Sequence, residues 1–419
     1  MSTTTKPSSP SLVSRVKRAA RANWLFISLG AIAIVSLVRI VTDTNDLTSV
    51  GTIRAAIIAT CPILMAALGG LWAERAGVVN IGLEGQMILG TWGAAYFTYH
   101  GGNPWIGVLG AALLGMIGGL LHAVATVTFG VDHIVSGVAI NLIGLGATTY
   151  LAAATFPDLN GGGPRQLIGL DSPGQINKVP GISDAAQNVA DKHWFFISDI
   201  ASFIAALTTK ISLLSLVIFA LVALSAWILW KTPFGLRLRS CGENPQAAET
   251  LGVNVYLYKY VAVLISGALA GIGGGFLALV SSSGFNVGQT GGRGYIGLAA
   301  MIFGNWRPGG LLLGALTFGY TDALRLRDAH AVHALLLLVA LGLLALAVLR
   351  LVRRQFAGAI TMGLLGAAIL TWFLSTESVP RDFTSMTPYV TTLFVLALGT
   401  QRLRMPAADG IPYRKGSAG

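Results

Sequence analysis

The sequence predicts an all-α polytopic integral membrane protein with about ten to twelve transmembrane helices. Of its 419 residues, 54% are hydrophobic and only 11% are charged, whereas soluble domains carry about 25% charged residues. Apolar stretches close to the roughly 20 residues that cross a bilayer recur along the whole chain. The short alternating segments that a membrane β-barrel needs are absent from the sequence. Helices are therefore the expected spanning elements.

Basic residues cluster between or beside the apolar stretches, as the positive-inside rule predicts for cytoplasmic segments. This distribution explains the net charge of +11 as membrane orientation rather than nucleic-acid binding. With a cytoplasmic N-terminus, strict alternation places every basic cluster in the cytoplasm, although stretches 293–307 and 388–401 are short enough to be re-entrant. The apolar stretches are 24–41, 53–72, 83–99, 105–128, 133–156, 211–230, 256–281, 293–307, 309–326, 331–349, 357–374 and 388–401.

This topology divides the chain into four parts. They are a basic cytoplasmic tail at 1–22, a transmembrane domain at 23–330, further transmembrane helices at 331–404 and a cytoplasmic tail at 405–419. The first apolar stretch has no cleavage pattern of small residues, so we expect an uncleaved helix rather than a signal peptide.

A long connection, residues 157–210, is expected to face outward. Its Trp194, Phe195 and Phe196 suit an interfacial helix at the level of the lipid headgroups. The connection is either a tolerated insertion or a docking surface for an external partner.

A second connection, residues 231–255, is expected to lie in the cytoplasm. Within it Asn244 can cap a helix, Pro245 suits its first position and Gly252 suits its end. A helix of about two turns is too short to be stable alone. It therefore either packs on its own protein or docks into a cytoplasmic partner.

Motifs for enzyme chemistry are missing. No Gly-Lys dipeptide occurs, so there is no P-loop, and no His, Cys, Asp or Glu cluster has metal-ligand spacing. The sequence thus predicts no catalytic residue, metal or cofactor in this chain. Among ionisable residues inside apolar stretches, we expect His122 to be a satisfied interfacial residue. Asp322 and Arg325, three apart on one helical face, should form a local ion pair.

The polar segment "ERAGVVNIGLEGQMILG", Glu74–Gly90, interrupts the apolar pattern. Its glycines make one continuous helix unfavourable. In one interpretation Asn80 caps a new helix that begins near Leu83, with Glu84 in its first turn. In the other, the break lines a transport path, as broken helices do in many transporters.

A second segment resembles the first. "IGLEGQMILGTW" (Ile81–Trp92) aligns with "IGLAAMIFGNW" (Ile296–Trp306) when one residue is omitted. The two segments begin stretches five apart, which therefore run in opposite directions. This arrangement predicts an inverted repeat with a break in each half.

Four blocks of sequence resemble the permease subunits of bacterial ABC importers of the ribose/branched-chain amino acid superfamily, and most closely its nucleoside branch. They are Gly70–Gly90, "GENPQAAETLGVNV" (Gly242–Val255), "SGALAGIGGGFLAL" (Ser266–Leu279) and "GGRGYIGLAAMIFGNWRPGG" (Gly291–Gly310). They occur in the expected order and cover about residues 50–330. One departure concerns substrate specificity: the family usually has an acidic and amide-rich approach to Gly-Arg-Gly, where this chain has "FNVGQTGGRG" (Phe285–Gly294).

The resemblance implies partners and a location. The helix Pro245–Leu251 would be the coupling helix that docks on a cytoplasmic ABC ATPase, which binds ATP and Mg²⁺. The other expected partners are a second, homologous permease in a heterodimer and an extracytoplasmic substrate-binding lipoprotein, in a bacterial plasma membrane. The residues that match the coupling motif are Gly242, Glu243, Asn244, Ala247, Ala248 and Gly252.

The resemblance also implies a substrate path for nucleosides. Asn80, Glu84 and Gln86 are the candidates to line it, with Arg293 on the opposite half. A permease for simple sugars or another small solute is the alternative within this class. An ion-coupled secondary transporter and a structural membrane scaffold are the alternatives outside it.

Overall fold

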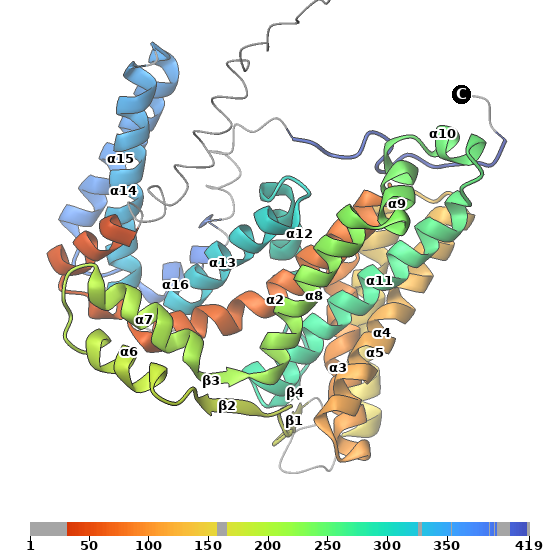
Figure 1. The fold of residues 1–419 in the computed structure, drawn as a ribbon, viewed down its shortest axis with the longest axis horizontal. Coiled ribbons are helices and arrows are strands. Elements are labelled where there is room, and N and C mark those ends of the chain that lie inside the picture. Colours follow the sequence, from red (N-terminus) through yellow and green to blue (C-terminus); the bar gives the residue numbers. More distant parts are fainter. Residues whose placement is uncertain are drawn as a thin grey trace, which may run out of the picture. The chain divides into compact units, whose positions relative to one another are not determined.

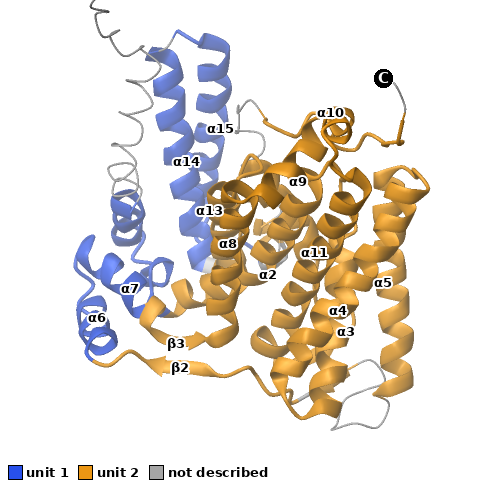
Figure 2. Ribbon diagram, turned by 45° about the vertical axis from the view of Figure 1, so that its right-hand side comes forward, with its two compact units in different colours: residues 1–50, 181–205, 328–380 blue, residues 51–180, 206–327, 381–419 orange. Residues whose placement is uncertain are grey.

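The computed structural model describes residues 32–156, 166–325, 329–352, 354–384, 386–388, 390–391 and 403–416, and these are mostly helical (Figure 1). The chain divides into two units (Figure 2). Unit 1 comprises residues 1–50, 181–205 and 328–380, and unit 2 comprises residues 51–180, 206–327 and 381–419.

Unit 2 is built on helices that pack side by side (Figure 2). They are α2 (Val50–Arg75), α3 (Leu83–Gly101), α4 (Pro104–Ala123), α5 (His133–Thr155), α8 (Leu213–Lys231) and α11 (Val255–Phe276). Single π-helical turns, η2 (Val124–Thr128) and η3 (Leu277–Ser281), extend α4 and α11. Glycines allow α4 and α11 to approach closely: a Cβ on Gly271 would lie 2.2 Å from the Ala111 carbonyl oxygen. Small residues at such crossings are typical of membrane helix packing.

Shorter elements complete unit 2. The helices are α9 (Pro233–Glu243), α10 (Pro245–Thr250), α12 (Arg293–Phe303), α13 (Pro308–Arg325) and α16 (Arg381–Thr384). Two antiparallel strand pairs join β1 (Gln166–Ile168) to β4 (Gly284–Asn286) and β2 (Gln175–Lys178) to β3 (Thr209–Ser212). The sequence analysis predicts none of these strands. The first pair fastens the long connection to the segment after α11, with Leu167 opposite Phe285. The second pair joins the long connection to the residues directly before α8.

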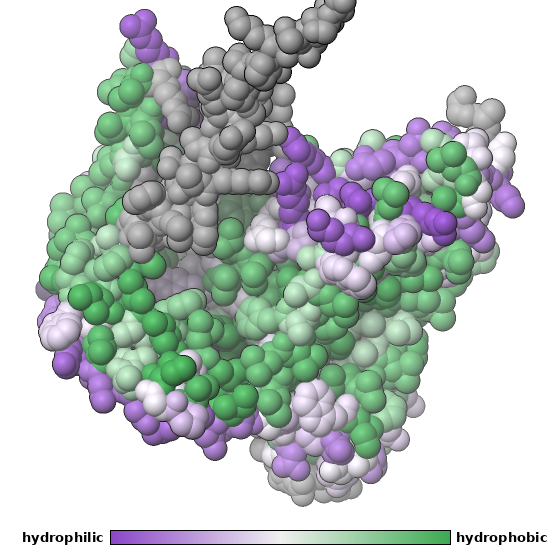
Figure 3. Space-filling view, in the orientation of Figure 1, coloured by the Kyte–Doolittle hydropathy of each residue, from purple (hydrophilic) through white to green (hydrophobic). Residues whose placement is uncertain are grey.

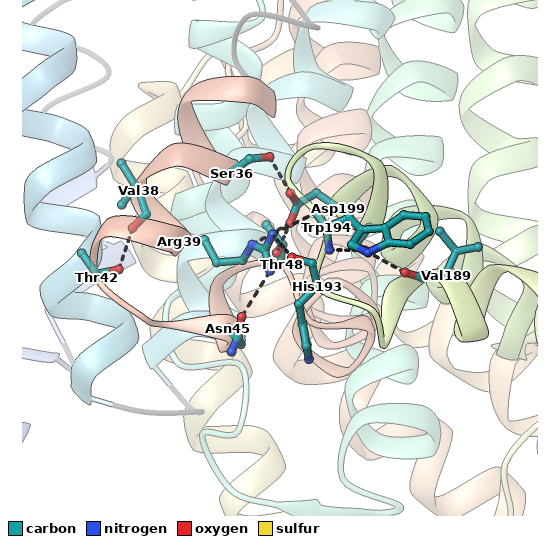
Figure 4. Close-up of polar contacts among 11 residues, drawn as sticks. Ser36, Val38, Arg39, Thr42, Asn45, Thr48, Val189, His193, Trp194 and Asp199 are labelled. Atoms are coloured by element: carbon teal, nitrogen blue, oxygen red, sulfur yellow. Dashed lines mark hydrogen bonds and ion pairs between the residues drawn. The ribbon is translucent and has the colours of Figure 1, made fainter.

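Unit 1 contains the described helix Ile32–Val41, η1 (Asn45–Leu47), α6 (Ile182–Ala190), most of α7 (Ile197–Thr208), α14 (Ala329–Val352) and α15 (Phe356–Ser375). A buried ion pair ties its first helix to α7 (Figure 4): Arg39 Nε lies 3.1 Å from Asp199 Oδ1. Ser36 and Thr48 also donate to Asp199. Because each charge has several partners, the cost of burying the pair is offset. The aromatic residues just before α7 are half exposed, Trp194 at 52% and Phe195 at 50%.

Seven helices in the described part of the chain are long and apolar enough to cross a membrane. They are Asn45–Arg75, Pro104–Thr128, His133–Thr155, Leu213–Lys231, Val255–Ser281, His330–Val352 and Phe356–Ser375. In unit 2, hydrophilic residues gather around α9 and α10 and apolar residues cover the helices next to them (Figure 3). The all-α polytopic fold class is confirmed. The count of ten to twelve spans stays a prediction, and most of stretch 388–401 lies outside the described residues.

Candidate functional site

The first candidate region is the break between α2 and α3, residues 76–82, called here the broken segment. Gly77 has a φ of +82°, a left-handed conformation that favours glycine. α3 begins at Leu83, as predicted, but the predicted cap is wrong: Gly82 occupies the N-cap position and no side chain caps α3. Asn80 is therefore free of a capping role and is used elsewhere.

Polar side chains from neighbouring helices satisfy the backbone of the broken segment. The Val79 N–H donates to His133 Nδ1 at 3.1 Å, and the Val79 carbonyl lies 3.0 Å from His122 Nε2. Lys259 Nζ donates to the Gly77 carbonyl at 3.3 Å. Irregular backbone at membrane depth persists only where protein or a cavity satisfies it. His122 is thus satisfied, as predicted, by Ser136 and the Val79 carbonyl. It is fully buried, and it supports the break.

Two of the predicted path residues, Asn80 and Gln86, pair with each other. Asn80 Nδ2 donates to Gln86 Oε1 at 3.0 Å and to Ser266 Oγ of α11 at 2.9 Å. Both side chains are fully buried, with 0% exposure. In this conformation their polar groups face each other, so a substrate could reach them only after the surrounding helices separate.

Glu84 joins the two predicted breaks. Its carboxylate accepts hydrogen bonds from Thr290 Oγ1 at 2.6 Å, the Gly292 N–H at 2.9 Å and the Gly294 N–H at 2.6 Å. These donors form the N-terminus of α12, where free amides and the helix dipole favour a negative charge. A Cβ on Gly294 would lie 2.6 Å from Glu84 Cα, so the glycine permits the contact. The two breaks face each other, and Glu84 caps the helix that follows the second one.

Asn141 of α5 completes this junction, and the sequence analysis missed it. Its Oδ1 accepts from the Gly85 N–H at 2.7 Å, and its Nδ2 donates to the Ile81 carbonyl at 3.1 Å and to the Tyr295 hydroxyl at 3.0 Å. The available signal was an asparagine in the middle of an apolar stretch, because polar residues inside membranes are commonly functional.

Arg293 lies in a network of charges. Its Nη2 is 2.8 Å from Asp322 Oδ2, and Arg325 Nε is 2.5 Å from Asp322 Oδ1. The predicted local ion pair of Asp322 and Arg325 is confirmed. The Arg293 side chain keeps 17% exposure. Together with Glu84, these residues place two positive and two negative charges around the start of α12, so the local net charge is zero.

The second candidate region is the predicted short helix, α10. Asn244 Oδ1 accepts from the Ala247 N–H at 2.9 Å, and Pro245 is the first helical residue. Gly252, with φ +80°, follows the helix. Local capping chemistry therefore places both ends of this helix as the sequence predicts.

The two faces of α10 differ. Ala248 is 2% exposed and packs with Cys241 and Val255 of the same chain. Ala247 is exposed, and Leu251 is 84% exposed. Since residues four apart share a helix face, Ala247 and Leu251 form the outward face. The sequence analysis did not single out Leu251.

The last residues of α9, Gly242 and Glu243, lead into α10 and are called here the base of α10; they lie against the end of α2. A Cβ on Gly242 would lie 2.4 Å from the Arg75 carbonyl oxygen, and Glu243 Oε1 is 3.8 Å from Arg75 Nη1. Arg75 Nη2 also donates to the Trp306 carbonyl at 2.6 Å, and Trp306 Nε1 donates to Glu74. These contacts bring the base of α10, the broken segment and the turn after α12 together.

The polytopic helical fold, its paired breaks and its short capped helix are those of a membrane permease subunit. Residues 52–348 match the family described as the branched-chain amino acid transport system permease component. The chain belongs to this family, which confirms the resemblance. No solved structure matches it.

Several characterised relatives are similar over most of the chain. The guanosine ABC transporter permease protein NupQ of Bacillus subtilis is 34% identical over 370 residues, 87% of this chain and 96% of the relative. The nucleoside ABC transporter permease protein NupC of Lactococcus lactis is 34% identical over 374 residues, 86% of this chain and 95% of the relative. A guanosine ABC transporter permease protein, NupP of Bacillus subtilis, is 26% identical over 266 residues, 62% of this chain and 69% of the relative.

Proposed function

We propose that this chain is the transmembrane permease subunit of an ATP-binding cassette importer and forms the translocation path for nucleosides. The observation that supports this most is the 34% identity to guanosine and nucleoside permeases across 87% and 86% of the chain. The protein would lie in a bacterial plasma membrane with its N-terminus in the cytoplasm. It would have no catalytic site of its own.

The junction of the two breaks is the proposed place of substrate passage. Neutral ribosides need hydrogen-bond donors and acceptors, which the carboxamides of Asn80 and Gln86 supply. In a closed state without substrate, the hydrogen bond of 3.0 Å between these two carboxamides would replace the hydrogen bonds that they make to a nucleoside. Movement of α4 and α11, which cover Gln86 and hold Asn80 through Ser266, away from the broken segment would release these groups. Arg293 would face them from the second half.

The energy for transport would come from a partner. A cytoplasmic ATPase would bind ATP and Mg²⁺ and receive the outward face of α10. A substrate-binding lipoprotein would deliver nucleoside on the outer side. A heterodimer is supported by the relatives, because Bacillus subtilis has NupQ and NupP and Lactococcus lactis has NupC and NupB.

Uptake of labelled guanosine by cells that carry the complete importer tests the substrate path. Asn80→Ala and Gln86→Ala should each lower uptake by about tenfold, the equivalent of about 1.4 kcal/mol, at unchanged expression. The exposed Asn177→Ala is the matched control and should behave as wild type. Wild-type uptake in both variants would remove these residues from the path.

The same assay separates the alternatives. Competition by unlabelled glucose or ribose, but not by nucleosides, would favour a sugar permease. Transport by this chain alone on an ion gradient, without the ATPase, would overturn the importer assignment.

Docking of the ATPase is tested on the two faces of α10. Leu251→Glu should reduce copurification of the ATPase without lowering thermal stability, because Leu251 is 84% exposed. Ala248→Glu should abolish transport and also lower the melting temperature, since it buries a carboxylate among apolar side chains. Full ATPase association in Leu251→Glu would show that this face is not the docking surface.

A further inference from the structure

The C-terminal segment, residues 403–416, runs along the end of unit 2 that carries α9 and α10 (Figure 1). Backbone hydrogen bonds attach it at separate points. The Arg404 N–H donates to Asn305 Oδ1 at 2.7 Å, in the turn after α12, and the Ala408 N–H donates to the Gly242 carbonyl at 2.9 Å, at the base of α10. The segment therefore touches both the turn after α12 and the base of α10.

Tyr413 attaches the segment to α10. Its ring packs against the cluster formed by Cys241, Ala248 and Val255, which includes the inward face of α10. Burial, with help from the nearby Glu249 carboxylate, raises the pKa of the Tyr413 phenol. The Tyr413 side chain is thus a neutral, partly buried aromatic group that packs on the cluster of the inward face of α10.

Other residues of the C-terminal segment are in close contact with the broken segment. A Cβ on Gly77 would lie 3.2 Å from the Ala408 carbonyl oxygen. Gly410, with φ +75°, approaches so closely that its Cβ would lie 3.3 Å from Val79 Cγ2. Lys259 contacts both the broken segment and the C-terminal segment. Its Nζ donates to the Gly77 carbonyl and lies 6.0 Å from the centre of the Tyr413 ring.

Asp409 is placed in an unusual environment beside α2. The residue is buried, at 9% exposure, and its carboxyl group lies against the Gly410 backbone N–H. Its neighbour is the carboxyl group of Glu74, with Lys259 and Arg75 close by. A proton shared between the two carboxyl groups would satisfy both. Burying a carboxyl group costs free energy, and a segment that only filled space would not require one at this position.

We propose that the C-terminal segment transmits displacement of α10 to the broken segment, with Tyr413 as its contact on α10 and Asp409 as its contact beside α2. The proposal rests on the proposed function for the role of α10 in docking. Displacement of α10 would also move its base at Gly242 and the cluster of Cys241, Ala248 and Val255 on which Tyr413 packs. The segment then moves against Gly77 and Val79, next to the paired carboxamide of Asn80.

Hydrogen exchange of the backbone amides at 76–82 tests the proposal without a substrate. It is measured in the full permease complex, with and without the docked ATPase and a non-hydrolysable ATP analogue. In wild type, docking should change exchange in this segment. In Tyr413→Ala and in Asp409→Ala the change should fall by at least about fivefold, the lower end of typical coupling between sites, while the ATPase still copurifies.

Two controls belong to the experiment. Tyr413→Phe keeps the aromatic ring and should show the wild-type response. Met405→Ala changes an exposed side chain of the same segment and should also show the wild-type response. If Tyr413→Ala no longer binds the ATPase, Asp409→Ala alone decides the test. Asp409 lies beside α2 rather than on α10, so its replacement should leave the docking face unchanged. A wild-type response in Asp409→Ala, or no response to docking in wild type, would overturn the proposal. Failure of nucleoside uptake would count only against the proposed substrate.

Discussion

Single buried polar residues hold the junction between α3 and α12 together. Glu84 receives three donors from the α12 N-terminus, and Asn141 connects the start of α3 to Tyr295. Charge-assisted hydrogen bonds of this kind are stronger than neutral ones, and they leave a costly unpaired group when one partner is lost. The junction is therefore sensitive to small chemical changes.

Replacement of Glu84 by glutamine should lower the free energy of unfolding by about 2 kcal/mol. The shape is kept, but the amide turns an NH₂ group toward the N–H donors of α12. Denaturant unfolding in detergent measures the change. Glu377→Gln, at an exposed position, is the control and should have no effect. Equal stability of the two variants would show that Glu84 is not the cap of α12.

The environment of Asp409 leads us to predict that the stability of the folded protein depends on pH. Burial raises its pKa from 3.8 to about 7 in the folded protein, so the folded state holds the proton more tightly than the unfolded state. The resulting stability is complete below about pH 4 and is lost as the pH rises through about 7. The charged groups that face Asp409 are Glu74 and Arg75 on α2 and Lys259 on α11.

Thermal unfolding between pH 5 and 8 measures this effect. The melting temperature of wild type should fall with rising pH more steeply than that of Asp409→Asn, which cannot ionise. Titrating groups that do not contact Asp409 are common to both proteins and cancel in the comparison, so the difference reports on Asp409 together with its neighbour Glu74. Parallel curves would mean that Asp409 does not titrate in this range.

At the scale of elements, close helix crossings depend on glycine. A Cβ on Gly267 of α11 would lie 2.3 Å from the Gly115 carbonyl oxygen of α4. Lipid offers no hydrophobic drive for helices to associate, so such close contacts provide much of the packing energy. This crossing supports Ser266, the partner of Asn80.

Gly267→Val should therefore destabilise the protein by about 1–3 kcal/mol or more, because the added carbons force α4 and α11 apart. Thermal unfolding in detergent is the measurement. Gly146→Val is the matched control, since a Cβ there meets nothing within 4 Å. Loss of stability in both variants alike would point to helix propensity rather than packing.

At the scale of the whole molecule, the proposed path, the coupling helix and the C-terminal segment all belong to unit 2. The family match, residues 52–348, includes most of that unit and parts of unit 1. Unit 1 gathers three separate stretches of chain, and the four-part division expected from the sequence stays a prediction. The inverted repeat of the two breaks stays a prediction, although the breaks do meet through Glu84.

Local chemistry is what the sequence by itself determined. Hydropathy indicates the membrane class, the Asn244 and Pro245 pair places α10, and the spacing of Asp322 and Arg325 predicts their ion pair. Each depends on residues that are close along the chain. Only the tertiary structure decided the rest: Glu84 meets Gly292 from 208 positions away, and Ala248 is buried in a cluster with Cys241 and Val255 on which the distant Tyr413 packs. Such contacts depend on how helices fold back on each other, which local patterns do not specify.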